Sequence, residues 1–465
     1  MASVALAPTE LGTEKIGKLL KMYAVPGIIA QTAASLYNMV DSIYIGHIPG
    51  VGSAAISGLA VTFPLMNLAT AMGTLVGVGA TTLISVLLGQ KNYDTARKVL
   101  SNVLSLNLII GALFSGVTLA FLDPILRFFG ASDVTLPFAR DYMLIILIGN
   151  VFTHLYFGFN GLIRASGHPK TAMGLTLFTV ISNAVLDPIF IFVFEMGIRG
   201  AALATVICQM AALVYTMKFF LDKKNLLHFP KPMFQIDWRI AGQSLAIGLG
   251  PFLMNSAACL VALFINQQLG KYGGDLAIGA YGIVNRLTML FIMVCMGFNQ
   301  GLQPIAGYNY GARQYHRVKE VFVLTAKWEI LVTSLCFLMA ELIPGLAVSL
   351  FTNDPEMIRM ASKALRIMCA GTALVGFGIT TSTFFQCLGM VSKSIFLSLS
   401  RQLIFLLPLI YSLPMWFQEK GVWMSFPIAD TLSVVVSLVF VLRLFKKFDK
   451  LKDGQDAGAL GSAIK

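Results

Sequence analysis

Long apolar segments alternate with short polar connections through almost the whole chain. A bilayer crossing needs roughly 20 mostly apolar residues in a helix, and twelve segments meet this length: 22–46, 57–86, 100–122, 137–163, 170–194, 198–220, 244–269, 277–304, 318–342, 358–388, 395–417 and 421–445. Charged residues make up 12% of the chain, against about 25% in soluble domains. The sequence therefore predicts an all-α polytopic membrane protein with twelve transmembrane helices.

Lysine and arginine gather on one set of alternating connections. The termini and the loops that follow even-numbered spans are rich in both, as at Arg97-Lys98 and Lys223-Lys224, whereas the opposite loops carry few. Cytoplasmic loops hold such an excess, so both termini are predicted to be cytoplasmic, in the plasma membrane (the inner membrane of a bacterium). Topology then explains the net charge of +12, and no nucleic-acid partner is expected. A monomer surrounded by membrane lipid is predicted.

The chain repeats itself at an offset of 222 residues, which pairs Gly89 with Gly311 and Gly167 with Gly389. Six spans per copy is an even number, so the copies keep one orientation and are predicted to be two six-helix bundles related by a pseudo-two-fold axis along the membrane normal. The predicted domains are an N-lobe over 1–221, a cytoplasmic linker over 222–243, a C-lobe over 244–446 and a disordered cytoplasmic tail over 447–465.

Two aspartates within apolar segments occur in the first copy only. Asp41 faces Leu263 across the repeat (or Ile265 with a two-residue slip), and Asp187 faces Leu409. An aspartate at mid-span costs about 2.5–3.5 kcal/mol on insertion scales. A duplicated scaffold with acidic chemistry in one half is the pattern expected of a two-lobed transporter whose coupling site lies in a single lobe.

Further polar side chains accompany the two aspartates. Tyr37 lies one turn before Asp41 with Asn38 adjacent, and Asn183 lies one turn before Asp187. The remaining members of the predicted set are Asn160 in the fourth span and Thr205 in the sixth.

If these faces converge, their carboxylate, amide and hydroxyl oxygens suit a proton or a sodium ion. Sodium would be held by Asp41, Asn183, Asp187 and Thr205. Two alternatives stay open: Asp41 as a solvated residue near the end of its span, and Asp187 and the amides as helix-packing groups.

Two prolines interrupt these spans. Pro188 follows Asp187 directly, and Pro26 lies near the start of the first span. Proline removes one helical N–H and frees a carbonyl, so Pro26 is predicted to be a hinge at which the first helix bends.

The combination of twelve duplicated spans, Pro26, Asp41, the string from Asn183 to Pro188 and the loops at Gly167 and Gly389 resembles the multidrug and toxic compound extrusion (MATE) family. The resemblance covers essentially the whole chain and is nearest to the prokaryotic branch with a carboxylate pair in the N-lobe.

The resemblance implies export of drugs and other amphipathic or cationic compounds in exchange for H⁺ or Na⁺, and hence antibiotic resistance. It also implies that Asp41, Asn160, Asn183, Asp187 and Thr205 form the cation-coupling site. Another branch carries acidic coupling residues in the C-lobe, but spans 7, 8 and 10 here contain no Asp or Glu. A coupling site in that lobe is therefore not expected.

Two other classes of function are less well supported. A lipid-linked oligosaccharide flippase can share this duplicated architecture but expects a cluster of cationic side chains in its cavity. An intramembrane enzyme needs a nucleophile–base pair or a metal motif such as His-Glu-x-x-His, and the sequence contains none. The chain is therefore predicted to be a secondary active transporter without catalytic residues or a cofactor other than its coupling ion.

Overall fold

The computed structural model describes residues 8–451 and 453–455, except for the side chains at positions 38, 39, 53, 56 and 275. Within that part of the chain the regular structure is helical, without β-strands. Ten helices there are long and apolar enough to cross a membrane, and the bent pair Pro355–Cys369 with Thr372–Cys387 gives an eleventh span. These eleven coincide with the second to twelfth predicted spans, and the all-α membrane fold is confirmed. The first predicted span, 22–46, lies within a helix of 31 residues.

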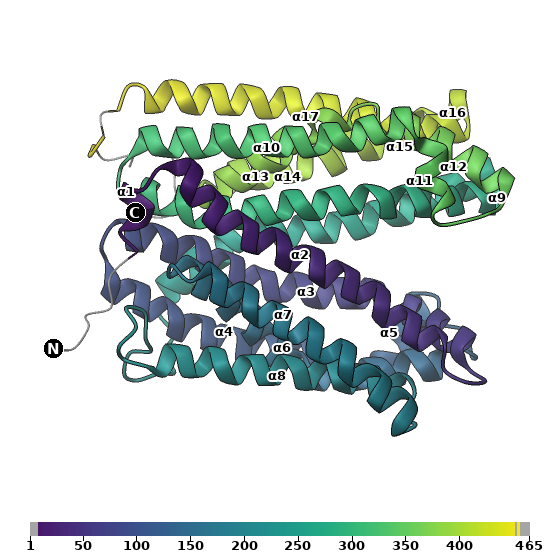
Figure 1. Ribbon diagram of the computed structural model, residues 1–465, viewed down its shortest axis with the longest axis horizontal. Helices are drawn as coiled ribbons and strands as arrows, with labels where there is room; N and C mark the ends of the chain where they lie inside the picture. Colours follow the sequence, from purple (N-terminus) through teal and green to yellow (C-terminus); the bar gives the residue numbers. More distant parts are fainter. Residues whose placement is uncertain (1–7, 452, 456–465) are drawn as a thin grey trace. The chain divides into compact units, whose positions relative to one another are not determined.

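The helices can be followed along the chain by colour in Figure 1. The first repeat comprises α1 (Glu10–Thr13), α2 (Ile16–Gly46), α3 (Gly52–Gly89), α4 (Tyr93–Ala120), α5 (Leu122–Phe128), α6 (Leu136–Ala165), α7 (Pro169–Pro188), the π-helix η1 (Ile189–Val193) and α8 (Ile198–Leu221). The second comprises α9 (Trp238–Gly311), α10 (Tyr315–Leu342), α11 (Pro344–Ser349), α12 (Pro355–Cys369), η2 (Thr372–Leu374), α13 (Val375–Cys387), α14 (Val391–Leu399), the π-helix η3 (Ser400–Leu406), α15 (Leu407–Ser412), α16 (Pro414–Phe417) and α17 (Glu419–Phe448).

The helix bounds follow the internal repeat. Adding 222 to either end of α4 gives the corresponding end of α10, and the same step leads from the last residue of α6 to that of α13. Helix α9 runs through the counterparts of α2 and α3, turning at Gly274, where φ is +67°. Glycine adopts this left-handed conformation without a steric penalty. The duplication seen in the sequence is therefore a duplication of helices.

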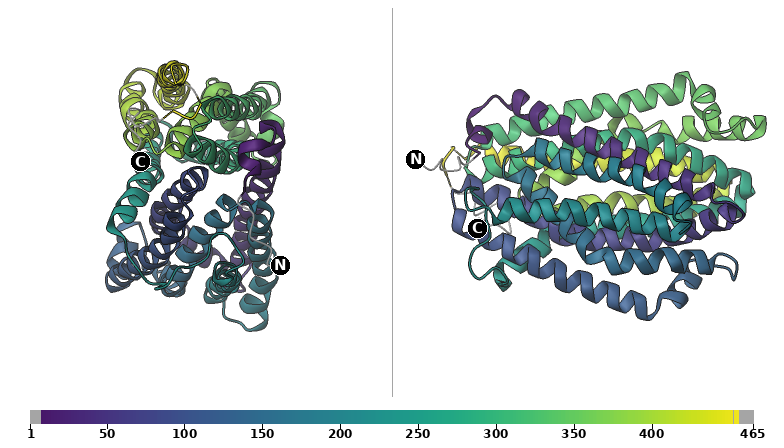
Figure 2. Two further views of the ribbon diagram at one scale, coloured as in Figure 1. Left: turned by 90° about the vertical axis from the view of Figure 1, so that its left-hand side faces the viewer. Right: turned by 60° about the horizontal axis from the view of Figure 1, so that its bottom comes forward.

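The chain forms two compact units. Unit 1 comprises the residues up to Thr13 and Ile29–Phe252, and unit 2 comprises Glu14–Ile28 and the residues from Leu253 onward. Within unit 1, α6 packs against α3, α4, α7 and α8; within unit 2, α13 packs against α10, α14 and α17. The left view of Figure 2 shows several of these helices end-on.

Two short segments depart from a division of the chain into consecutive halves. The start of α2, up to Ile28, belongs to unit 2, and the start of α9, up to Phe252, belongs to unit 1. Both exchanges occur within two residues of a proline, Pro26 in α2 and Pro251 in α9. The first helix of each repeat is thus shared between the units.

Glycines bring the exchanged segments close to their neighbours. In unit 2, a Cβ atom at Gly301 would lie 2.7 Å from the backbone nitrogen of Ala24, and one at Gly297 would lie 2.5 Å from Cα of Ile28. In unit 1, a Cβ atom at Gly79 would clash with the backbone of Ser244. Small residues let the backbones of membrane helices approach closely, and here they fix the segments that change unit.

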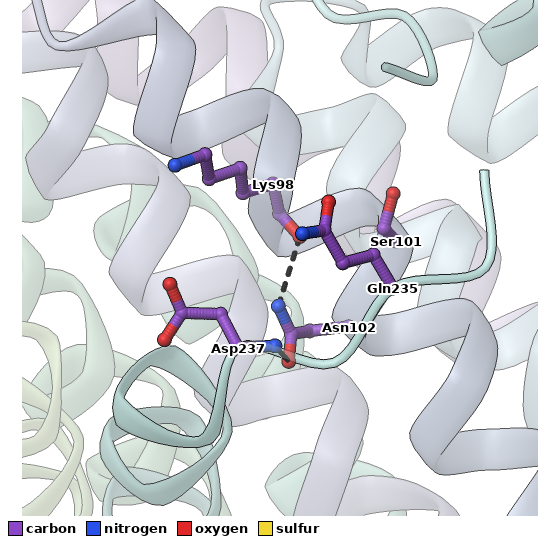
Figure 3. A pocket seen from close by; sticks show the side chains of 5 residues that line it. All are labelled: Lys98, Ser101, Asn102, Gln235 and Asp237. Atoms are coloured by element: carbon purple, nitrogen blue, oxygen red, sulfur yellow. Dashed lines mark hydrogen bonds between the residues drawn. The ribbon is translucent and has the colours of Figure 1, made fainter. Parts of the chain in front are cut away.

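The linker is tied to α4 through a small polar pocket (Figure 3). The backbone N–H of Asp237 donates to Asn102 Oδ1 at 3.2 Å, and Asn102 Nδ2 donates to the carbonyl of Lys98 at 3.0 Å. The Asp237 carboxylate accepts from the N–H groups of Arg239 and Ile240 at 3.0 and 3.3 Å, which satisfies donors in the first turn of α9. This cluster positions the start of α9, and its polar groups serve the backbone.

The predicted disorder of the tail is wrong for its first residues. Helix α17 continues to Phe448. Beyond it, Asp453 accepts a hydrogen bond of 2.8 Å from the N–H of Tyr315, and the carbonyl of Gln455 accepts one of 2.6 Å from the Tyr315 hydroxyl. These bonds supply partners at the start of α10, where helical N–H groups lack intrahelical acceptors. The predicted tail beyond residue 455 lies outside the described residues.

Candidate functional site

A hydrogen-bonded pair on α7 forms the centre of the candidate site. Asn183 and Asp187 are one turn apart and share a face, with side chains 3% and 0% exposed. Asn183 Nδ2 donates to Asp187 Oδ1 at 2.6 Å. The amide therefore holds one carboxylate oxygen, while Asp187 Oδ2 is buried without a hydrogen-bond partner.

Helices α8 and α2 extend this pair into a chain of four side chains. The Thr205 hydroxyl donates to Asn183 Oδ1 at 3.1 Å, and the Tyr37 hydroxyl lies 3.3 Å from the Thr205 oxygen. Because the Asn183 oxygen is an acceptor and its nitrogen a donor, the bonds can run in one direction from Tyr37 to Asp187. The structure thus brings together the predicted residues of α2, α7 and α8.

Asp41 is the second carboxylate of the site. Its side chain is 7% exposed, and its Oδ1 is buried without a hydrogen-bond partner. Asp41 and Asp187 interact electrostatically with one another, and the buried Tyr142 of α6 interacts with both. No ion pair of either aspartate is found among the described residues. Tyr142 was not predicted, since a tyrosine beside charged residues at a span end gives no distinctive signal.

The backbone changes its helical form directly after Asp187. Helix α7 ends at Pro188, and η1 continues as a π-helix in which the N–H of Phe194 donates to the carbonyl of Ile189 at 2.9 Å. Proline cannot donate to the preceding turn, and single π-turns within α-helices are frequent at functional sites. The predicted interruption at Pro188 therefore coincides with the buried carboxylate.

Asn160 does not join this cluster. Its Nδ2 donates to the carbonyl of Ala172 at 3.0 Å, and its Oδ1 accepts from Arg164 Nη2 at 3.3 Å. Ala172 precedes Asn183 by eleven residues, which is roughly 16 Å along α7 at about 1.5 Å per residue. The expectation that Asn160 contributes to the same pocket is therefore corrected: its amide is engaged further along the helix pair.

Two other predicted residues lie on α2. Pro26 is buried within the continuous helix, near the point where α2 passes from unit 2 to unit 1. The side chain of Asn38 lies outside the described residues.

A buried ion pair in unit 2 gives Asp430 a partner that sequence reasoning missed. Arg401 Nε donates to Asp430 Oδ1 at 2.6 Å, with side chains 33% and 4% exposed. Arg401 lies in the π-helix η3 and Asp430 in α17, twenty-nine residues away. No local spacing links two such positions. Arg286, by contrast, is exposed.

The two units therefore differ in electrostatic character. In unit 2 the buried Asp430 is neutralised by arginine, whereas in the described part of unit 1 two neighbouring carboxylates have no cationic partner. The free oxygens of Asp41 and Asp187, together with the Asn183 and Thr205 oxygens, fit the hard-oxygen preference of a proton or sodium ion. Among the described residues, no group of three or more His, Cys, Asp or Glu side chains is arranged to hold a metal ion.

Comparison with known proteins gives a consistent result. The MatE family model matches residues 26–189 and 251–412, one segment in each repeat. The multidrug export protein MepA of Staphylococcus aureus (strain MSSA476) is 28% identical, over 92% of this chain and 94% of its own length.

Solved structures agree. DinF-BH, a MATE multidrug transporter whose structure was determined as a complex with a small molecule, is 35% identical with a TM-score of 0.86, over 95% of this chain and 98% of that one. An outward-facing MATE family transporter of the MOP superfamily has a TM-score of 0.89 over 96% of this chain and 100% of that one, and at 23% identity shows the fold alone.

Proposed function

This chain belongs to the MatE family, whose members are transporters rather than enzymes, and we propose that it is a cation-coupled antiporter. It exports drugs and other amphipathic organic compounds by alternating access, in exchange for H⁺ or Na⁺. The observation that carries the coupling is the pair of buried carboxylates, Asp41 and Asp187, which have no cationic partner among the described residues of unit 1.

The electrostatics of this pair support a cation as the coupling species. Two neighbouring carboxylates in a dry interior repel one another and lose hydration, so their doubly charged form is unfavourable. A bound proton or Na⁺ removes that penalty. The site therefore favours one conformation when loaded and another when empty, which is the differential affinity that coupling requires.

The hydrogen-bonded chain gives the site a fixed geometry. Asn183 orients Asp187 and is itself held by Thr205, so a cation at Asp187 also affects Tyr37 on α2. Pro26 lies upstream on the same helix, close to where α2 changes unit. A bend at Pro26 that depends on the charge of Asp41 would link cation binding to movement of the helix.

Substrate class follows from the relatives. MepA is a multidrug export protein and DinF-BH a multidrug transporter, and this chain carries 34 Phe and 22 Met. Aromatic rings and flexible thioethers suit a pocket that repacks around varied organic cations. The basic loops support a plasma-membrane location with both termini in the cytoplasm.

The flippase alternative is not favoured. It needs cationic side chains free to meet a pyrophosphate headgroup, and the buried Arg401 is engaged by Asp430. No specific observation in the described part of either unit supports that activity.

Dye transport tests the proposal. Uptake of ethidium into inside-out vesicles is measured under an imposed pH gradient and, separately, under an imposed sodium gradient. We expect one of the gradients to drive transport in the wild type, and Asp41→Asn and Asp187→Asn each to abolish it while the protein still reaches the membrane.

A matched control is Asp133→Asn. Asp133 is 89% exposed and pairs with Arg127 at 2.8 Å on the surface, so this variant should transport normally. Unchanged gradient-driven transport in both Asp41→Asn and Asp187→Asn would refute cation coupling at this site.

A further inference from the structure

Unit 2 contains one buried acidic side chain that the proposed function does not use. Glu329 lies at the middle of α10, not near the start of its span as the sequence suggested, and it is 0% exposed. Neither carboxylate oxygen has a hydrogen-bond partner. Lys327, two residues away, is exposed and points to another side of the helix. Removing a charged carboxylate from water costs several kcal/mol without a partner, so this position calls for an explanation.

Helix α13 forms one wall around Glu329. A Cβ atom at Gly376 would lie 3.0 Å from Glu329 Cβ and 2.5 Å from its carbonyl oxygen, so the two helices touch here through glycine. Thr380 follows one turn later on the same face of α13. Its hydroxyl lies beside the carboxyl group and donates to the Gly376 carbonyl at 2.9 Å, which leaves its oxygen free to accept.

Helix α9 forms a second wall. The rings of Phe298 and Trp328 stack with centroids 6.3 Å apart and planes 10° apart, which fixes α9 beside the turn that carries Glu329. On the same side of α9, the Cys295 thiol interacts electrostatically with the carboxyl. Asn299 is one turn beyond Cys295, 5% exposed, with both amide atoms lacking a partner.

Helix α10 itself adds Thr325, one turn before Glu329. This threonine is 0% exposed, and its hydroxyl has no hydrogen-bond partner. Buried polar groups are hydrogen-bonded in the great majority of cases. Three unpartnered side chains in neighbouring turns, Thr325, Glu329 and Asn299, therefore indicate a site whose occupant or whose protons complete the bonding.

The ionisable surroundings of this site are sparse. The elements packed against α10 are α11, α12, η2, α13 and α17, besides α9. Among the described residues, the Cys295 thiol is the ionisable group that faces Glu329. Asp430 of α17 is engaged by Arg401. Within this part of the chain, no buried cation is therefore placed to balance a charged Glu329.

The first repeat has a neutral amide at the same position. The counterpart of Glu329 at the 222-residue offset is Asn107 of α4, which is also 0% exposed with both amide atoms unpartnered. The counterpart of Thr380 is Gly158, where a Cβ atom would lie only 2.9 Å from Asn107 Nδ2. The carboxyl and the hydroxyl thus occur together, and only in the second copy.

We propose that Glu329, with Asn299, Thr325 and Thr380, forms a second proton-binding site, located in unit 2. The protonated carboxyl can donate to the Asn299 oxygen and accept from a threonine hydroxyl. After the proton leaves, the Asn299 amide and the two hydroxyls can turn to donate to the carboxylate. The site therefore satisfies both forms, and the proton is released when the surrounding helices admit water.

This inference rests on the proposed cation-coupled export, which it extends by a second exchanging acid. It predicts that more than one proton is exchanged per molecule exported. The acidic groups of unit 1 and the site of unit 2 would then load the two units separately.

Infrared difference spectroscopy tests the site on the purified full chain in nanodiscs. Spectra are recorded across a pH series with and without ethidium, in NaCl and in KCl. We expect a protonated-carboxyl band that changes with pH and with ethidium, and its loss in Glu329→Gln. In proteoliposomes with a reporter of internal pH, Glu329→Gln should exchange one proton fewer per ethidium exported.

Two variants serve as controls. Glu341→Gln removes a carboxyl near the end of the same helix and should keep the band and the stoichiometry. If Glu329→Gln does not fold, Glu329→Asn supplies the side chain that the first repeat tolerates at this position, and Thr380→Val keeps the carboxyl but should shift its titration.

The outcomes separate cleanly. A spectrum of Glu329→Gln identical to that of the wild type, or a band unaffected by both pH and ethidium, overturns the proposal. A band that responds to NaCl but not to pH also overturns it and assigns the site to sodium. If neither gradient drives wild-type transport, the proposed function fails, whereas the infrared band is measured without a gradient and decides this inference independently.

Discussion

Asn183 and Asp187 lie one turn apart on α7, and the amide of the first donates to the carboxylate of the second at 2.6 Å. The other end of the same amide accepts from Thr205 on α8. One side chain thus connects the buried acid to a second helix, and its removal should affect coupling more than folding.

We expect Asn183→Ala to weaken cation binding. Losing one hydrogen bond to a buried charged group is worth about 1.5–3 kcal/mol, which corresponds to roughly a tenfold or larger change in affinity. The measurement is the dependence of ethidium efflux on the concentration of the coupling cation. Asn225→Ala, which alters a linker residue, is the control; a half-saturating concentration that is equal in both variants would contradict the assignment.

The Thr205 hydroxyl offers an almost isosteric test. Thr205→Val keeps the shape but removes the donor to Asn183, whereas Thr205→Ser keeps the donor. We expect efflux to fall severalfold in the valine variant, since a lost neutral hydrogen bond is worth about 0.5–1.5 kcal/mol. The serine variant should remain close to wild type. Equal efflux in the two variants would show that the hydroxyl has no part in coupling.

The ion pair of Arg401 and Asp430 should matter for stability. Breaking a buried pair from one side costs about 3–5 kcal/mol, whereas replacing both partners by apolar residues is often neutral. Because Arg401 is one-third exposed, we expect the lower end of that range. Arg401→Met and Asp430→Leu should each lower the apparent melting temperature in detergent.

The double variant Arg401→Met/Asp430→Leu completes that cycle and should recover most of the loss. Additive losses in the double variant would mean that the two side chains act independently.

Close packing at Gly301 gives a fourth prediction. A methyl group there would meet the Ala24 backbone at 2.7 Å, whereas a methyl group at Gly282 on the same helix would have no atom within 4 Å. Gly301→Ala should therefore destabilise by about 1–3 kcal/mol, and Gly282→Ala should be neutral or stabilising. Thermal unfolding of both variants checks this, and equal melting temperatures would argue against the close approach of α2 and α9.

Much of the helical framework could be predicted from the sequence. Apolar segments of sufficient length have no alternative to helices in a bilayer, and the glycines and polar loops at the 222-residue offset marked where they end. The local pairs were accessible for the same reason: Asn183 and Asp187 share a face because helical periodicity places them there.

Contacts between distant helices were not predictable in this way. Arg401 meets Asp430 and Asn160 meets the carbonyl of Ala172 because of how helices align along their lengths. Glu329 resembled a residue at a span boundary, since its burial depends on α13 and α9 coming together around it. Tyr142 joined the two aspartates for the same reason.

The exchange of the first helix halves has a consequence for the origin of the chain. A single repeat made on its own would present its first fifteen or so residues without the neighbours that cover them, and a second copy could supply those neighbours reciprocally. Such reciprocal exchange is the geometry of a domain-swapped dimer. The present chain is then a swapped pair made permanent by the linker, and one copy was free to keep Asp41 and Asp187 while the other acquired Glu329.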